Sequence, residues 1–101
     1  MAYEEARPLR ALVESRREQV RAVASRHRAS RVRLFGSVAR GEEGPGSDID
    51  LLVDFDPDSS LFDLMRMTRE LEELLGHPVD IVSVGGLKDR DREILTDSID
   101  L

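Results

Sequence analysis

Two aspartates and a glycine-serine pair are the residues of this chain whose types and spacing could do chemistry. Gly36-Ser37 is followed ten residues later by Asp48 and Asp50, which lead into an apolar, β-prone run at 51–53. Side chains of a strand alternate between its two faces, so the two aspartates point the same way, roughly 7 Å apart at a rise of ~3.3 Å per residue. Carboxylate oxygens so placed favour a shared hard cation such as Mg²⁺ or Mn²⁺.

The glycine-serine pair predicts a phosphate-binding turn. Gly36 has no Cβ, so its backbone can approach a triphosphate closely and can adopt a positive φ. Ser37 offers a hydroxyl and a backbone N–H at the start of a short helix. Arg40 follows one turn later and is a candidate to bind a phosphate, although a role as a plain surface arginine is equally compatible with the sequence. We therefore predict that Gly36, Ser37 and Arg40 bind a nucleotide.

These motifs, with a further aspartate, Asp80, in the apolar run 79–82, resemble the polymerase-β-type nucleotidyltransferase superfamily. The short chain is similar to its minimal nucleotidyltransferase (MNT) branch. The resemblance implies Asp48, Asp50 and Asp80 as catalytic carboxylates that hold two Mg²⁺ ions, with ATP as the donor. It also implies a partner, a small helical HEPN ribonuclease toxin, one of whose tyrosines receives AMP. The protein would then be the antitoxin of a HEPN/MNT toxin-antitoxin pair.

Two other functions stay open at this point. One is a nucleotidyltransferase that modifies a small molecule such as an antibiotic, although the chain has no room for a separate acceptor domain. The other is a non-catalytic antitoxin that neutralises its toxin by binding alone. Asp54 is the next candidate for the third carboxylate if Asp80 is not the ligand. His27 and His77 stand singly, without a partner at ligand spacing, and are interpreted as structural or surface residues.

Composition places limits on the protein. The 101 residues suffice for a single domain, 1–101, and contain no cysteine, so disulfides and thiolate metal sites are excluded. No apolar run approaches the ~20 residues that cross a bilayer, and we expect a soluble, cytoplasmic protein. The net charge is −6, with ten arginines against four glutamates in 1–40 and seventeen acidic against five basic residues in 41–101. The acidic half makes direct nucleic-acid binding unlikely.

The pattern of apolar residues and breakers predicts an α/β fold, a small mixed β-sheet with flanking helices in the order α-β-α-β-α-β-α. We expect an N-terminal helix at about 8–28, a catalytic core at about 31–84 and a C-terminal helix at about 88–98. Within the core, strands are expected at 31–35, 49–55 and 79–84.

A further helix is expected from Ser59 or Ser60 to residue 75. Its inward face would carry Leu61, Leu64, Met65, Thr68, Leu71, Leu74 and Leu75. The apolar residues near the C-terminus are expected to contact the partner protein, with packing back on the protein's own sheet as the alternative; they are Ile94, Leu95, Ile99 and Leu101.

Overall fold

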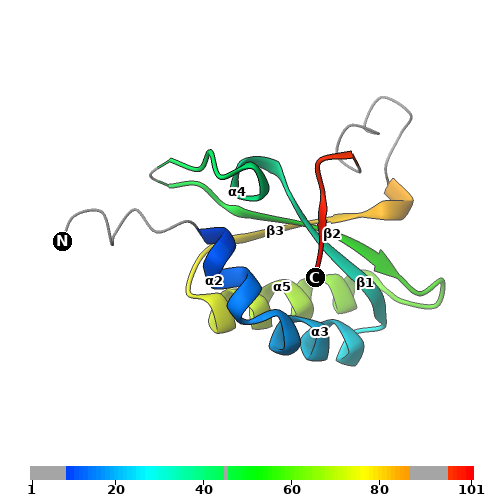
Figure 1. Ribbon diagram of the computed structural model, residues 1–101. Helices are drawn as coiled ribbons and strands as arrows, with labels where there is room; N and C mark the ends of the chain where they lie inside the picture. Colours follow the sequence, from blue (N-terminus) through cyan, green and yellow to red (C-terminus); the bar gives the residue numbers. More distant parts are fainter. Residues whose placement is uncertain (1–8, 45, 87–95) are drawn as a thin grey trace.

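The computed structural model describes residues 9–44, 46–86 and 96–101, and within them the strands form a four-stranded mixed sheet (Figure 1). The strand order is β3-β2-β1-β4, where β1 is Ala29–Phe35, β2 is Ile49–Phe55, β3 is Val79–Ser83 and β4 is Ile99–Asp100. β1 runs antiparallel to β2 and β4, whereas β2 and β3 are parallel. This is the small mixed α/β sheet that the sequence predicts.

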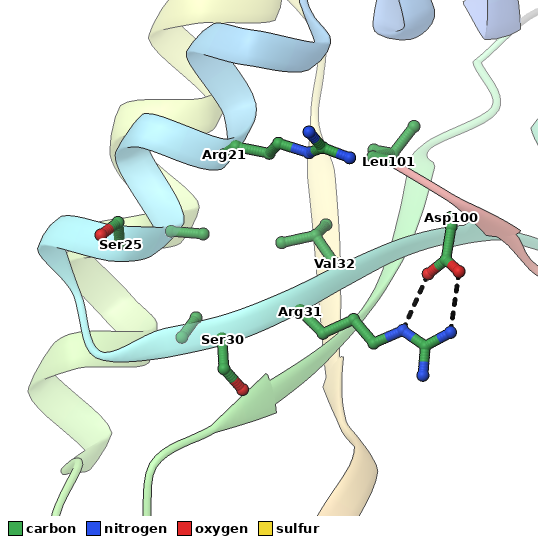
Figure 2. A pocket seen from close by; sticks show the side chains of 9 residues that line it. Arg21, Ser25, Ser30, Arg31, Val32, Asp100 and Leu101 are labelled. Atoms are coloured by element: carbon green, nitrogen blue, oxygen red, sulfur yellow. Dashed lines mark hydrogen bonds and ion pairs between the residues drawn. The ribbon is translucent and has the colours of Figure 1, made fainter.

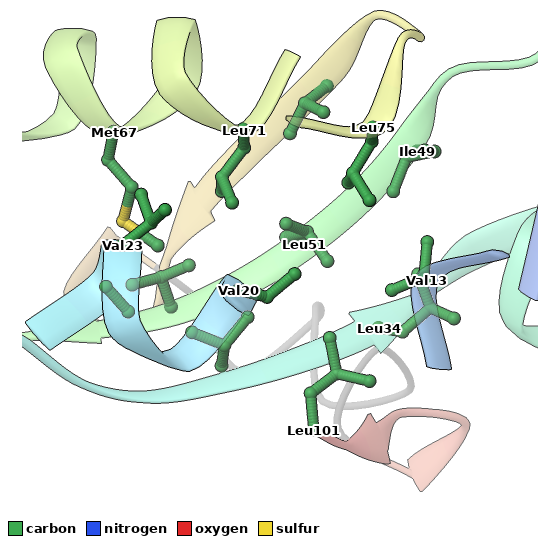
Figure 3. Packing of buried hydrophobic residues seen from close by; sticks show 14 of the residues in the cluster. Val13, Val20, Val23, Leu34, Ile49, Leu51, Met67, Leu71, Leu75 and Leu101 are labelled. Atoms are coloured by element: carbon green, nitrogen blue, oxygen red, sulfur yellow. The ribbon is translucent and has the colours of Figure 1, made fainter. Parts of the chain in front are cut away.

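Helices α3 and α5 cover one face of the sheet (Figure 1). Ile49, Leu51 and Val53 of β2 are buried in the core that these helices share with the sheet, and Leu52 is buried as well but lies outside this cluster. Figure 3 shows the side chains of Leu34, Leu51 and Leu71 from three elements packing together in this core. The intervening residues of each strand point to the opposite face, which is where the polar motif residues lie.

The N-terminal helix predicted at 8–28 is two helices in the structure, α2 from Leu9 to Ser15 and α3 from Arg17 to Arg26. The prediction of one continuous helix is wrong because Arg16 leaves the helical conformation, with φ −108° and ψ 16°. The apolar positions of α2 and α3, Val13 and Val20, are both fully buried. A break between them lets each helix turn its own apolar face onto the core.

Helix α5, Leu61–Leu75, begins and ends as its sequence predicts. The Ser60 N–H donates a hydrogen bond to Oδ2 of Asp63 at 2.9 Å, and Gly76 ends the helix with φ +69°. Its buried face differs from the predicted one, because Met67 is completely buried.

The first turn of α5 lies outside the core. Leu61 and Met65, expected to face inward, are 69% and 56% exposed, and Phe62 beside them is 66% exposed. The predicted inward face was therefore wrong at these first positions.

Helices α3 and α5 are also joined by a polar contact. Arg26 donates to Glu70 at 2.7 Å, and Nε2 of the buried His27 lies 3.0 Å from the other oxygen of the same carboxylate. These interactions hold the pKa of Glu70 below its ordinary value. The structural interpretation of His27 therefore agrees with its position between the two helices.

The C-terminal residues form a strand that the sequence did not predict. The predicted helix at 88–98 falls largely outside the described residues, and Ser98, its last residue, is not helical. Ile99 of β4 pairs with Leu34 of β1, and Leu101 is buried in the core. The expectation that Ile99 and Leu101 contact a partner is wrong, because both pack on the protein's own sheet; Ile94 and Leu95 lie outside the described residues.

Two smaller boundaries also differ from the prediction. β1 begins at Ala29, two residues before the predicted 31–35 strand, and β3 ends at Ser83, where a 3₁₀ turn, η1 Val84–Gly86, follows. None of the helices in the described ranges is long and apolar enough to span a bilayer.

Candidate active site

The motif residues meet on the face of the sheet opposite α3 and α5. β2 and β3 are paired so that Asp50 lies directly beside Asp80, and Phe35 of β1 is the neighbour of Asp50 on the other side. Residues paired in this way project their side chains to the same face. The register therefore brings an aromatic residue and two carboxylates into one row across three strands.

Gly36 and Asp50 are in direct contact. Gly36 has φ +76°, and a Cβ at that position would lie 3.2 Å from Cγ of Asp50 and closer still to its Oδ2. A side chain at residue 36 would thus be strained by the backbone and would overlap the carboxylate. The glycine-serine turn and the Asp-x-Asp pair, predicted as two parts of one motif, are adjacent in space.

The electrostatics of Asp50 reflect this crowding. Burial is the main cause that raises the pKa of Asp50 above its ordinary value, and the negative charges of Asp80 and Asp48 raise it further. Arg40 acts in the opposite direction. Within the described part of the chain, none of the three aspartates accepts a hydrogen bond or joins an ion pair. The negative charges of Asp48 and Asp80 outweigh the effect of Arg40 on the Asp50 carboxyl, and a surplus of negative charge of this kind suits the binding of a cation.

Asp48 immediately precedes β2, which begins at Ile49 as predicted. Ile49 donates its N–H to the carbonyl of Pro78 at 3.0 Å, which fixes this end of β2 beside the start of β3. Asp48 and Asp80 are exposed, and among the described residues no three acidic, histidine or cysteine side chains lie close enough to form a finished metal site. The donor set is nonetheless all oxygen, which fits Mg²⁺.

Arg40 ends the short helix α4, Gly36–Arg40, and is near enough to Asp50 for their charges to interact. Its Nε donates to Oε1 of Glu42 at 2.8 Å, and this hydrogen bond is the main cause that raises the pKa of Arg40. Asp97 and Asp50 contribute by their charges. Arg40 therefore lies near Asp50 but is hydrogen-bonded to a glutamate, and its binding to a nucleotide stays a prediction.

Three residues near the site did not enter the sequence-based prediction of the site. Asp97 precedes β4 and reaches the neighbourhood of Arg40 only through the fold. Glu43 accepts a hydrogen bond from the Leu9 N–H at 2.8 Å and so ties the loop before Asp48 to α2. Phe35 could have been singled out because it immediately precedes Gly36, but its place beside Asp50 depends on strand register.

The alternative third carboxylate, Asp54, is on the same strand as Asp50. It is four residues further along β2, or about 13 Å at ~3.3 Å per residue, and it pairs with Arg31 in the adjacent strand. That separation is too large for a shared ion. The fold therefore favours Asp80 over Asp54 as the neighbour of Asp50.

Comparison with known proteins gives the class of this site. Residues 16–100 match the nucleotidyltransferase domain family. The chain is 44% identical over 80 residues to the "Putative protein adenylyltransferase MJ0435" of Methanocaldococcus jannaschii, an alignment that covers 75% of this chain and 83% of that protein. It also superposes on the solved structure of a "putative minimal nucleotidyltransferase" with a TM-score of 0.82 and 49% identity, over 91% of this chain and 95% of the other.

A more distant match is the crystal structure of a "toxin-antitoxin with AMP-PNP", with a TM-score of 0.69 and 19% identity over 82% of this chain and 69% of the other. At that identity the likeness concerns the fold. The chain belongs to the nucleotidyltransferase domain family. It is a nucleotidyltransferase with the minimal nucleotidyltransferase fold.

Proposed function

We propose that the protein transfers AMP from ATP to a tyrosine of a HEPN ribonuclease toxin and thereby acts as its antitoxin. The observation that carries the chemical part of this proposal is the packing of the Asp50 carboxylate against Gly36, in register with Asp80. The contact supports the proposal because it brings the glycine-serine turn, which would bind the phosphates, next to a carboxylate that would help to hold Mg²⁺. The protein acceptor is supported by the name of the Methanocaldococcus jannaschii relative.

In this proposal the glycine-serine turn binds the triphosphate. The backbone at Gly36 can approach phosphate oxygens closely because no side chain intervenes, and the Ser37 hydroxyl can donate to one of them. Arg40 must leave Glu42 to reach the triphosphate, so that one ion pair is exchanged for another. Because the Asp50 carboxylate lies against the turn, a triphosphate bound there would lie near the residues that would hold Mg²⁺.

The transfer itself is an in-line displacement. An acceptor hydroxyl oxygen bonds to the α-phosphorus, the bond from that phosphorus to the bridging oxygen breaks, and pyrophosphate leaves with the bond electrons. The hydroxyl proton is lost to solvent, to which Asp48 and Asp80 are exposed. Asp48, Asp50 and Asp80 would hold Mg²⁺, which when bound lowers the pKa of the acceptor hydroxyl and stabilises the charge on the leaving phosphates.

The antitoxin part of the proposal concerns the acceptor. The chain matches, in fold, an antitoxin-containing complex crystallised with AMP-PNP, an ATP analogue. In this proposal the acceptor surface belongs to a second protein, the toxin. A reaction that consumes ATP and modifies a ribonuclease would take place in the cytoplasm.

Co-expression with a HEPN protein tests this function. Intact-mass spectrometry should show that the partner gains one or more adenylyl units, and peptide mapping should locate them on tyrosine. The matched control is the Asp50→Asn protein, with which the mass of the partner should not change. An unmodified partner whose ribonuclease activity is nevertheless fully neutralised would support the non-catalytic antitoxin instead. Transfer of AMP to small hydroxylated compounds, with the partner left unmodified, would support the small-molecule enzyme.

A further inference from the structure

The edge of the sheet farthest from Asp80 is only partly covered. β4 pairs with just two residues of β1, Arg33 and Leu34, and the Leu101 N–H adds one hydrogen bond to the Val32 carbonyl at 3.0 Å. Within the described ranges no strand pairs with residues 29–31 on this side of β1. Unpaired backbone groups at such an edge are a template for a further strand.

A groove runs along this open edge, between α3 and β1 (Figure 2). It has a volume of about 510 Å³, and its floor is apolar, made of Ala24, Ala29, Val32 and Leu101, each at most 9% exposed. Figure 2 shows that Leu101 closes one end of the groove and that Ser25 and Ser30 lie at the other. An extended chain in line with β4 would rest on this floor.

Two arginines and one aspartate line the groove, which leaves a surplus of positive charge there although the protein as a whole carries a net charge of −6. Arg21 of α3 extends across the groove toward Leu101 (Figure 2), and no ion pair of Arg21 occurs among the described residues. Arg31 forms two hydrogen bonds with Asp100, at 2.8 and 2.7 Å. The hydrogen bond from Arg31, with the charges of Arg33 and Arg21, holds the pKa of Asp100 below its ordinary value.

β4 itself shows which kind of strand this edge accepts. Its sequence alternates, with Ile99 and Leu101 turned to the core and Asp100 turned to the arginines of β1. We propose that the groove along residues 29–32 binds an extended segment of a partner protein, in which acidic and apolar residues alternate, as an added β-strand. Backbone hydrogen bonds to β1 would supply affinity, and Arg21 would select acidic residues.

Charge argues against a second copy of this chain as the occupant. Pairing two β1 edges would bring Arg21 and Arg31 of both copies together around only one Asp100 from each. The proposal is also independent of the proposed function, since none of the candidate active-site residues lines the groove.

Peptide binding to the whole protein tests the proposal. The probe is a fluorescent, acetylated and amidated octapeptide of alternating Val and Asp, and the control peptide has Lys in place of Asp. We expect saturable binding of the Asp peptide, with changes in amide NMR shifts concentrated at Ser30, Arg31 and Val32. Arg21→Glu should weaken binding about tenfold, because an attraction becomes a repulsion. Arg69→Glu on the exposed surface of α5 is the matched control and should leave binding unchanged.

Four outcomes would overturn the proposal. They are no binding of the Asp peptide, equal binding of the Lys peptide, shift changes away from the β1 edge, and equal effects of Arg21→Glu and Arg69→Glu. A dimer of the unliganded protein that Arg21→Glu dissociates would assign the edge to a second copy. Displacement of the peptide by a uridine decanucleotide, in an Arg21-dependent manner, would assign it to nucleic acid.

Discussion

Replacing Gly36 with alanine tests whether the phosphate-binding turn and Asp50 form one packed unit. The backbone at Gly36 has φ +76°, a conformation that costs an L-residue roughly 1–2 kcal/mol. The new Cβ would also lie 3.2 Å from Cγ and 3.3 Å from Cβ of Asp50 and would overlap Oδ2. Overpacking of this kind costs typically about 1–3 kcal/mol. We therefore expect Gly36→Ala to lower the free energy of unfolding by about 2–5 kcal/mol.

Gly41→Ala supplies the matched control for this experiment. Gly41 has nearly the same conformation, φ +71°, but a Cβ there would meet nothing within 4 Å. Only the backbone cost of roughly 1–2 kcal/mol remains. Thermal and urea unfolding of both variants should show that Gly36→Ala melts at least about 4 °C lower, since 1 kcal/mol shifts the Tm of a domain this size by about 4–8 °C.

Combining Gly36→Ala with Asp50→Ala should recover part of the difference, because the overlapping carboxylate is then absent. Equal destabilisation by Gly36→Ala and Gly41→Ala would refute the reasoning, since the overlap with Asp50 would then add nothing to the loss of stability.

Three further predictions concern the charged residues of the site. Asp50→Asn should abolish transfer, yet it should raise the free energy of unfolding near neutral pH. The pKa of Asp50 is raised in the folded protein, so its carboxyl favours folding below the unfolded pKa, where it is protonated, and this contribution is lost as the pH rises through the folded pKa. Asparagine stays neutral and avoids that loss. Asp80→Asn should reduce kcat by at least about 100-fold if Asp80 is the third ligand, whereas Asp54→Asn should change it little. Glu42→Ala should release Arg40 and lower the KM for ATP several-fold with little change in kcat.

Each of these has a result that would count against it. The free energy of unfolding of Asp50→Asn is compared with that of wild type in urea titrations at several pH values. If the variant is no more stable than wild type near pH 7, the pKa of Asp50 is not raised by folding. A loss of only a few-fold in Asp80→Asn would place the third ligand elsewhere. Glu18→Gln, exposed on α3, is the control for Glu42→Ala, and an unchanged or higher KM would show that Glu42 does not compete for Arg40.

The sequence predicts well the parts of the fold that depend on local signals. β2 falls on its predicted residues because the apolar, β-prone run 51–53 forms its centre, and α5 ends at Leu75 because the glycine that follows, Gly76, adopts φ +69°. Non-local packing decides the rest. The break at Arg16 and the strand formed by Ile99 depend on which surface each segment meets, and neither has a sequence signal of its own.

The same distinction applies to the site. Gly36 and Asp50 could be selected by residue type and spacing, and Asp80 by the resemblance to nucleotidyltransferases. The register of β2 and β3 then brings Asp80 beside Asp50, which lies against Gly36. Asp97 lies far along the chain and reaches Arg40 through the fold alone, so spacing gave no hint of it. The pairing of Arg40 with Glu42 likewise depends on side-chain contacts, and the spacing of residues in the sequence does not predict them.

Transfer of label from ATP to a purified HEPN partner tests the central claim most directly. With ATP labelled at the α-phosphate, the account predicts Mg²⁺-dependent labelling of a partner tyrosine, and none with ATP labelled at the γ-phosphate, because pyrophosphate leaves. Asp48→Asn and Asp50→Asn should remain folded and transfer no label. Labelling that persists in both variants with saturating Mg²⁺, or a partner that stays unlabelled by the wild-type protein, would contradict the account.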